Sequence, residues 1–152
     1  MVIIEDTRQK PDKTDYISHQ LTELGCEVVR SKLLVGDYVI SNKSDVSVDT
    51  KQDMNEVESN LTSQHKRFRN ECELAQKCGI NLVILVQDDK LKTLDDVIKW
   101  YNPRKRYSKT ALSGKQLHKI MVTMSEKYGV QWSFCTKDSV GEKILEELTK
   151  HY

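Results

Sequence analysis

The chain has 152 residues, which is long enough to bury the core of one domain. Hydrophobic residues make up 38% and charged residues 31%, a balance that is typical of a soluble globular protein and excludes a disordered or fibrous one. No apolar run is long enough to cross a bilayer, and the start MVIIEDTRQ has neither a basic leader segment nor a cleavage site. We therefore predict a protein of the cytoplasm with no membrane partner.

The predicted elements alternate strands with helices along the chain. The N-terminal part is expected to form a strand, a helix and three further strands: Val2–Glu5, Tyr16–Leu24, Glu27–Leu34, Tyr38–Ser41 and Asp45–Lys51. The C-terminal part is expected to form a long helix, a strand, a short helix, a basic loop, a helix, a strand and a last helix: Met54–Lys77, Asn81–Gln87, Leu94–Trp100, Tyr101–Leu112, a helix capped at Ser113, Val130–Cys135 and a helix capped at Ser139.

This order of elements predicts the fold class. The nearly continuous apolar run NLVILVQ is the signature of a strand that is covered on both faces. Three strands in succession early in the chain indicate an antiparallel part, and the strands that alternate with helices indicate a parallel part. We expect an α/β fold with a mixed β-sheet and helices on both faces.

The stretch GDYVISNKSDVSVDTK concentrates acidic residues and a lysine at one place. Residues two apart on a strand project to the same face, so Asp49 and Lys51 are expected to point together. If Tyr38–Ser41 and Asp45–Lys51 form a hairpin, Asp37 falls opposite about Asp49. Two carboxylates in that position repel each other, and a divalent cation between them reverses the sign of the interaction.

Two interpretations of this stretch remain open from the residues alone. A divalent cation can polarise a phosphate and lower the pKa of a bound water, and Lys51 beside it is suited to stabilise the developing charge. Asp and Lys are also common in turns, so the same pattern is compatible with the solvated polar surface of a β-hairpin.

Several segments of the chain resemble the nuclease domain of the XPF family, which belongs to the PD-(D/E)XK superfamily of metal-dependent nucleases. In chain order they are IIEDTRQ, GDYVI, VSVDTKQDMNEVESNL and HKRFRNECELAQKCG, and VQWSFCTKDSVGEKILEEL is similar to the closing strand and helix of the family. The family motif is Gly-Asp, a gap, then Glu-Arg-Lys, three residues and Asp. The resemblance implies a restriction-endonuclease-like fold and a single XPF-type nuclease domain over residues 1–152, nearest to small single-domain bacterial or phage members.

The resemblance also assigns roles to the central residues. Asp37 matches the acid of Gly-Asp and Asp49 matches the glutamate, which implies that both are catalytic metal ligands. Lys51 matches the catalytic lysine. The implied cofactor is Mg²⁺ or Mn²⁺.

Residues outside this triad match less specific parts of the family pattern. Asp6 and Arg8 match the Asp and Arg of the first strand, and Arg67 matches an arginine on the following helix. Asp6 is thus a possible further metal ligand, with a turn cap as its alternative. Arg8 and Arg67 are suited to clamp a phosphate, although arginines are also common on solvated surfaces.

The sequence departs from the family motif at four positions. Thr50 replaces arginine, Gln9 replaces glutamate, and Asp49 is a shorter acid than the expected glutamate. Asn55 stands where the final aspartate is expected, and the neighbouring Glu56 is the acid that could replace it as a ligand.

A basic segment follows the predicted central strand. Net charge is +1, yet the six cations between Trp100 and Lys119 occur without any acid. Within it, YNPRKRYSK interleaves aromatic and cationic residues, which suits single-stranded or junction DNA but also describes a mobile solvated loop. The candidate nucleic-acid contacts here and on the long helix are Arg69, Arg104, Lys105 and Arg106.

Together these features predict a metal-dependent endonuclease that hydrolyses phosphodiester bonds in branched, flapped or junction DNA, in repair, recombination or replication. It would act in the cytoplasm of a bacterium or of the host of a phage, and as a homodimer if pairing supplies the substrate geometry. Because of Asn55 and Gln9, a catalytically degenerate nuclease-fold module that binds DNA or a protein partner is the alternative. A resolvase-like dimer acting on four-way junctions is a narrower third possibility.

Overall fold

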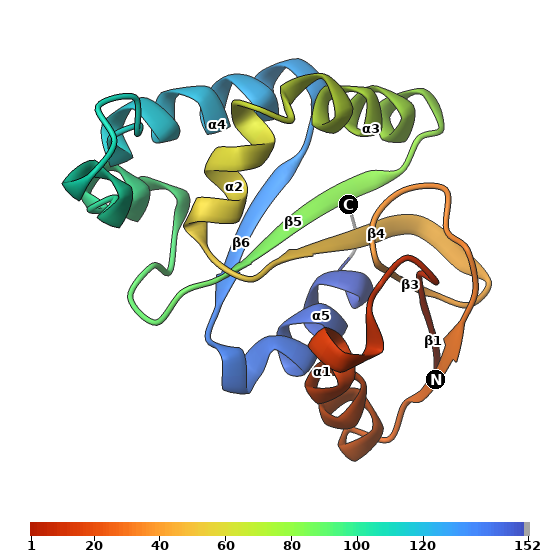
Figure 1. Ribbon diagram of the computed structural model, residues 1–152. Helices are drawn as coiled ribbons and strands as arrows, with labels where there is room; N and C mark the ends of the chain where they lie inside the picture. The colour runs from red at the N-terminus through yellow and green to blue at the C-terminus, as the bar shows by residue number, and fades with distance from the viewer. Residues whose placement is uncertain (151–152) are drawn as a thin grey trace.

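The structure, a computed structural model, describes residues 1–150 and contains one six-stranded sheet with helices on both faces (Figure 1). The order of strands across the sheet is β2-β1-β3-β4-β5-β6. The strands are β1 (Val2–Glu5), β2 (Glu27–Arg30), β3 (Tyr38–Ile40), β4 (Lys43–Lys51), β5 (Asn81–Gln87) and β6 (Gln131–Cys135).

The sheet is mixed in the way that the order of elements predicts. Strand β3 is antiparallel to both of its neighbours, β1 and β4. The pairs β1–β2, β4–β5 and β5–β6 are parallel. The predicted fold class is therefore confirmed, with the antiparallel part early in the chain.

Helices cover both faces of the sheet (Figure 1). The α-helices are α1 (Pro11–Glu23), α2 (Met54–Leu61), α3 (His65–Lys77), α4 (Gly114–Tyr128) and α5 (Val140–Thr149), and the 3₁₀ helices are η1 (Leu94–Lys99), η2 (Pro103–Arg106) and η3 (Lys137–Ser139). The α2, α3 and α4 helices share one hydrophobic core, and α1 and α5 share another on the opposite face. Among the helices of residues 1–150, none has the length and apolar character to span a bilayer.

Strand β5 explains why the central run of the sequence is almost entirely apolar. Leu82, Ile84 and Val86 belong to the core under α2, α3 and α4. Val83 and Leu85 belong to the core under α1 and α5. The strand is buried on both faces, as its sequence predicts.

The prediction of one helix from Met54 to Lys77 was wrong, because the structure has two helices there. Helix α2 ends at Leu61, and Thr62 has φ −121° and ψ −90°, which lie outside the helical region. The Oγ1 atom of Thr62 donates to the carbonyl oxygen of Glu58 at 2.7 Å. Threonine and serine compete in this way with the helical hydrogen bonds, and Thr62 and Ser63 occupy the break.

Other element boundaries also differ from the prediction. Helix α1 begins at Pro11 and not at Tyr16, since proline is well suited to the first position of a helix. Strand β2 ends at Arg30, so residues 31–37 leave the sheet. The short helix Leu94–Lys99 is a 3₁₀ helix, and the basic loop contains the 3₁₀ helix η2.

Candidate active site

Asp37 and Asp49 lie beside each other at the open end of the β3–β4 hairpin. Tyr38 pairs with Val48, and the amide of Asp37 donates to the carbonyl oxygen of Val48 at 2.8 Å. Asp37 Oδ2 accepts hydrogen bonds from the amide (2.8 Å) and the Oγ1 atom (3.0 Å) of Thr50. The hairpin register expected from the sequence is confirmed.

Lys51 shares the strand face of Asp49, as strand parity predicts. Its Nζ atom lies 3.1 Å from Asp49 Oδ2 and 5.7 Å from the centre of the Phe68 ring of α3. Burial acts to lower the pKa of Lys51, but the charges of Asp49 and Glu56 outweigh it and raise this pKa. The lysine is therefore held as a positioned cation by the carboxylate and the aromatic ring.

Glu71 is a further acid of the site that the family motif does not include. It comes from α3, and its Oε1 atom accepts a hydrogen bond from the amide of Gly36 at 3.1 Å. Burial, followed by the charge of Asp49, raises the pKa of Glu71. One signal was available: Glu71 follows Arg67 by four residues, a spacing that places two side chains on the same helix face.

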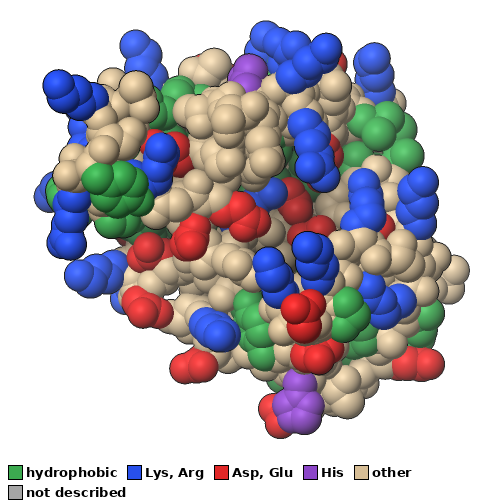
Figure 2. Space-filling model, viewed as in Figure 1, with side chains coloured by type: hydrophobic (Ala, Val, Ile, Leu, Met, Phe, Trp, Pro, Cys, Tyr) green, Lys and Arg blue, Asp and Glu red, His purple; other side chains and the backbone are tan. Residues whose placement is uncertain are grey.

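These residues line a cleft of about 400 Å³. Its acids are Asp6, Asp37, Asp49, Glu56 and Glu71, and its cations include Arg8, Lys51 and Arg67. Figure 2 shows acidic side chains gathered toward the middle of one face, where the surface is hollowed, with Lys and Arg side chains around them. Negative charge is thus concentrated in the cleft and positive charge surrounds it.

The positive charges in the cleft do not fully compensate the negative charges of its carboxylates. Burial, followed by the negative charge of Asp49, raises the pKa of Asp37 well above its ordinary value. Burial also raises the pKa of Glu56. The Oδ2 atom of Asp49 is buried and, despite its ion pair with Lys51, receives no hydrogen bond from the described residues.

A hard divalent cation fits this set of donors as an open site. Within residues 1–150 no three His, Cys, Asp or Glu side chains are grouped closely enough to enclose a metal. Mg²⁺ does not require such a group, because it is usually bound by one or two carboxylates together with waters and substrate phosphates. Asp37 and Asp49 supply two adjacent carboxylates, and Asp49 Oδ2 is an acceptor without a donor.

Asp6 lines the cleft, but both of its carboxylate oxygens already accept hydrogen bonds. Its Oδ2 atom accepts from Arg8 Nε at 2.6 Å, and its Oδ1 atom accepts from the amide of Leu33 at 2.8 Å. In this structure Asp6 positions Arg8 and fixes residues 31–37. Arg8 and Arg67 both line the cleft.

A partly buried ion pair fixes the turn that carries Arg8. Arg30 Nη1 pairs with the buried Glu5 at 2.5 Å, and Arg30 Nη2 donates to the carbonyl oxygens of Gln9 (2.6 Å) and Thr7 (3.1 Å). No pattern in the sequence predicts this network, because Glu5 and Arg30 are 25 residues apart.

Asn55, which occupies the position of the final motif acid, does not line the cleft. Its Nδ2 atom donates to Asn102 Oδ1 at 3.1 Å, so it contacts the basic segment on the far side of α2. Glu56, the next residue, does line the cleft. In this structure a side chain at position 55 lies outside the cleft, so having Asn there in place of an acid does not reduce the number of carboxylates in the cleft.

The remaining predicted DNA contacts lie outside the cleft. Arg104 Nη1 pairs with the buried Glu58 at 2.5 Å, whereas Lys105 and Arg106 are exposed. Arg69 lies 4.0 Å from Glu73 and lines a separate groove between α3 and α4.

A mixed sheet with paired acids and a lysine at the end of its hairpin defines the PD-(D/E)XK class of nuclease folds. The ERCC4 domain matches residues 5–144, and the chain therefore belongs to the ERCC4-domain family, the family of XPF. A comparison with curated protein sequences finds no match.

Solved structures with a similar fold include XPF from Aeropyrum pernix. It has a TM-score of 0.66 and 17% identity over 97% of this chain and 63% of that chain. XPF from Aeropyrum pernix in a complex with DNA gives the same TM-score, 0.66, and the same identity, 17%, over 97% of this chain and 62% of that one. The chain thus spans less than two thirds of the length of these structures, and its similarity to them is a similarity of fold.

Proposed function

We propose that the protein is a divalent-metal-dependent endodeoxyribonuclease that acts on branched, flapped or junction DNA. The observation that carries this proposal is the acidic cleft in which Lys51 Nζ lies 3.1 Å from Asp49 Oδ2, at the end of the β3–β4 hairpin. Membership of the ERCC4-domain family supports it. The DNA complex of the structurally similar Aeropyrum pernix protein supports DNA as the class of substrate.

Each residue of the cleft has a role in this proposal. Asp37 and Asp49 hold Mg²⁺ or Mn²⁺, with Glu71 adjacent to them. When bound, the cation polarises the scissile phosphate and lowers the pKa of the attacking water. Lys51, fixed by Asp49 and the Phe68 ring, stabilises negative charge that develops on the phosphate.

Two arginines are suited to bind the DNA backbone near the cut. Arg8 is held by Asp6 at the wall of the cleft, and Arg67 projects into the cleft from α3. Guanidinium groups bind phosphate oxygens through paired hydrogen bonds. Both residues are therefore assigned to phosphates that flank the scissile one.

Cleavage of flap, fork and four-way DNA by the purified protein with Mg²⁺ or Mn²⁺ tests the proposal. Asp49→Asn and Lys51→Ala are each expected to lower the single-turnover rate by roughly 100-fold or more. Lys77→Ala, at the exposed end of α3, is the control and is expected to leave the rate unchanged. Undiminished cleavage by the first two variants would contradict the assignment.

The second candidate is a non-catalytic module that binds DNA or a protein partner. It is favoured by Gln9, which lines the cleft in place of the motif glutamate and supplies no carboxylate. DNA retardation without added metal, together with no cleavage under any divalent cation, would support this function.

We also propose that the chain works as one nuclease domain and that two copies pair on DNA. Sedimentation of the protein with and without four-way DNA measures the pairing directly. Symmetric paired nicks on that substrate would identify the narrower resolvase-like activity.

A further inference from the structure

A second cavity, of about 220 Å³, adjoins the acidic cleft. Both are lined by Arg8, Gln9, Thr50 and Glu56, so they share a wall. Thr50 lies between Asp49 and Lys51 on β4, and alternate residues of a strand face opposite sides of the sheet. The two cavities therefore meet at the C-terminal end of β4, where Thr50 lines both of them.

The interior of this cavity carries a fixed pair of polar side chains. Gln87, at the end of β5, is only 7% exposed, and its Nε2 atom donates to the hydroxyl oxygen of Tyr16 at 2.6 Å. The Tyr16 ring comes from α1 and has the Nζ atom of Lys137 at 4.9 Å from its centre. Both side chains are thus held in place by two or more elements of the fold.

This pair keeps hydrogen-bonding capacity that residues 1–150 do not use. Within the described chain, the hydrogen bond between Gln87 Nε2 and the Tyr16 hydroxyl oxygen is the one side-chain hydrogen bond of both residues. The hydroxyl of Tyr16 therefore still has a proton to donate, and Gln87 Oε1 is still free to accept. Turning the amide over exchanges its two ends but still leaves one polar atom free. A donor and an acceptor side by side complement the edge of a nucleobase.

Cations stand at the mouth of the same cavity. Lys10 and Lys13 line it at the start of α1, and neither forms an ion pair within the described part of the chain. Together with Arg8 they are suited to a phosphate next to the base. The volume of about 220 Å³ is below the roughly 300–1,000 Å³ of cavities that hold drug-sized ligands, so a single base fits better than a longer segment.

We propose that this cavity is a nucleotide subsite, which receives the unpaired base one nucleotide away from the scissile phosphate. The inference rests on the proposed nuclease function, because it is the cleft that defines which phosphate is scissile. The base contacts Tyr16 and Gln87, and its phosphate contacts Lys10 and Lys13. A base in a duplex cannot enter, so the subsite selects DNA with an unpaired nucleotide at the cut.

An abasic scan of bound DNA tests the proposal without requiring cleavage. The affinity of the Asp49→Asn protein is measured for a series of flap DNAs in which one abasic position moves across the junction. One position is expected to weaken binding roughly fivefold, the loss of about one net hydrogen bond. In Asp49→Asn protein that also carries Tyr16→Phe and Gln87→Met, binding to intact DNA is expected to be roughly fivefold weaker, with no further loss at that position.

Controls separate the subsite from its surroundings. Tyr128→Phe removes a tyrosine hydroxyl from α4, on the other face of the sheet, and should preserve the sensitivity to the abasic position. Lys13→Ala changes an exposed side chain that does not endanger the fold, and it is expected to weaken binding of intact and abasic DNA equally. The melting temperature of each variant establishes that it is folded.

The outcomes distinguish this inference from the proposed function. Equal sensitivity to the abasic position with and without the Tyr16 and Gln87 substitutions, or no sensitive position at all, would overturn the subsite. Failure of the wild-type protein to cut any DNA would instead overturn the nuclease proposal, and the abasic scan would still report on base binding.

Discussion

Gly36 determines where the acid that follows it can lie. Its φ is +74°, and a Cβ atom at this position would meet Ser47 Oγ at 2.1 Å. Its amide donates to Glu71 at 3.1 Å. A side chain here would therefore disturb the approach of the Asp37 segment to β4 and to α3, which gives the Gly-Asp pair a physical cause in this chain.

Gly36→Ala is expected to reduce the free energy of unfolding by about 2 kcal/mol or more, from backbone strain and the clash with Ser47. Urea denaturation measures this loss. Gly129→Ala is the matched control, because its φ is +72° but an added Cβ would meet nothing within 4 Å. It should cost only about 1 kcal/mol, and equal losses in the two variants would refute the steric argument.

Asp37 makes the metal-free protein less stable at neutral pH. Burial and Asp49 raise its pKa above the ordinary value, so the folded state binds the proton more tightly than the unfolded chain does. Stability contributed by the protonated form is therefore present below about pH 4 and is lost as the pH rises through the raised pKa.

Asp37→Asn is expected to raise the melting temperature in EDTA at pH 7 and to reduce this pH dependence, since it removes one of the crowded charges. The same variant should lose most of the increase in melting temperature that Mn²⁺ causes in the wild type, because binding to the folded state is what produces that increase. Thermal unfolding with and without Mn²⁺ measures both effects. A less stable variant in EDTA would contradict the repulsion between Asp37 and Asp49.

At the scale of elements, α2 fixes the basic segment through Glu58, which is 1% exposed. Its Oε2 atom accepts from the amide of Leu112 (2.7 Å) and from Asn102 Nδ2 (3.0 Å). Its Oε1 atom pairs with Arg104 at 2.5 Å. Both ends of the segment are therefore tied to one helix, so Lys105 and Arg106 project from an anchored loop.

Glu58→Gln is expected to increase hydrogen exchange at the Leu112 amide and to increase tryptic cleavage after Lys105. Burial acts to raise the pKa of Glu58, but its hydrogen bonds from Leu112, Arg104 and Asn102 lower it below the ordinary value. Its contribution to stability is thus present above about pH 4.3 and is lost as the pH falls through the lowered pKa.

Glu58→Gln should remove this contribution to stability and with it the loss of stability as the pH falls. Glu73→Gln, on α3 and 4.0 Å from Arg69, is the control and should leave exchange at Leu112 unchanged. Unaltered exchange in Glu58→Gln would show that the segment is held by other contacts.

The sequence predicts those parts of the fold and site that depend on local patterns. Alternation along β4 places Asp49 and Lys51 together, and the length of the hairpin places Asp37 near them. The break between α2 and α3 escapes prediction because the apolar spacing continues on both sides of it. Glu71 escapes because its place depends on how α3 packs against the hairpin, which no spacing within one element encodes.

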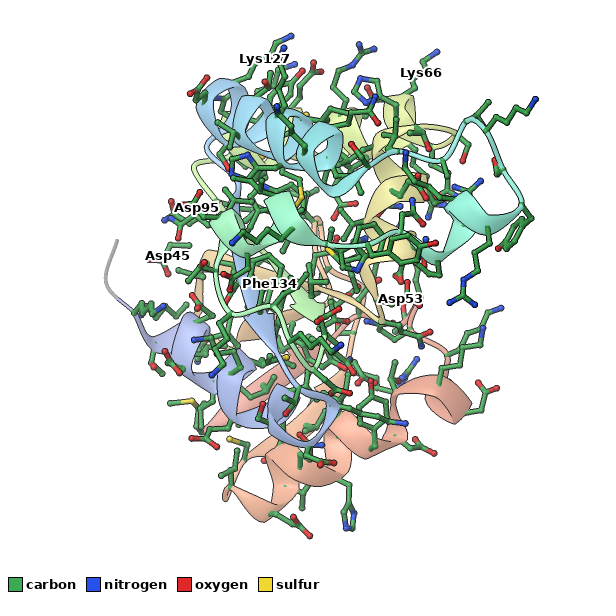
Figure 3. The ribbon with its side chains drawn as sticks, turned by 90° about the vertical axis from the view of Figure 1, so that its left-hand side faces the viewer. Asp45, Asp53, Lys66, Asp95, Lys127 and Phe134 are labelled. Atoms are coloured by element: carbon green, nitrogen blue, oxygen red, sulfur yellow. The ribbon has the colours of Figure 1, made fainter. Side chains whose placement is uncertain are left out.

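At the scale of the whole molecule, positive charge extends beyond the acidic cleft, whose own cations include Arg8, Lys51 and Arg67. Between residues 97 and 125 there is no acid, and Figure 3 shows Lys66 and Lys127 projecting from the same end of the molecule, where α3 and α4 lie. Duplex DNA carries closely spaced phosphates that such a surface attracts. The arrangement favours DNA that extends from the cleft across this end.

Lys105→Ala with Arg106→Ala is expected to weaken DNA binding and to reduce the slope of log affinity against log salt by about 1.8, or about 0.9 for each phosphate contact. Fluorescence anisotropy at several salt concentrations gives the slope. Lys43→Ala with Lys143→Ala removes the same charge from the start of β4 and from α5, which lies on the other face of the sheet from α3 and α4, and should leave the slope unchanged. Equal slopes for both double variants would exclude the basic segment from the interface.

The crowding of Asp37, Asp49 and Glu71 has a consequence for how such a protein changes over generations. Mutations that neutralise Asp37 or Glu71 relieve repulsion by Asp49, so a lineage released from the need to cut DNA gains stability by the same changes that end its activity. A library screened only for survival of heating should accumulate Asn and Gln at these positions. Loss of nuclease activity would then be difficult to reverse, since restoring each acid lowers the stability of the fold.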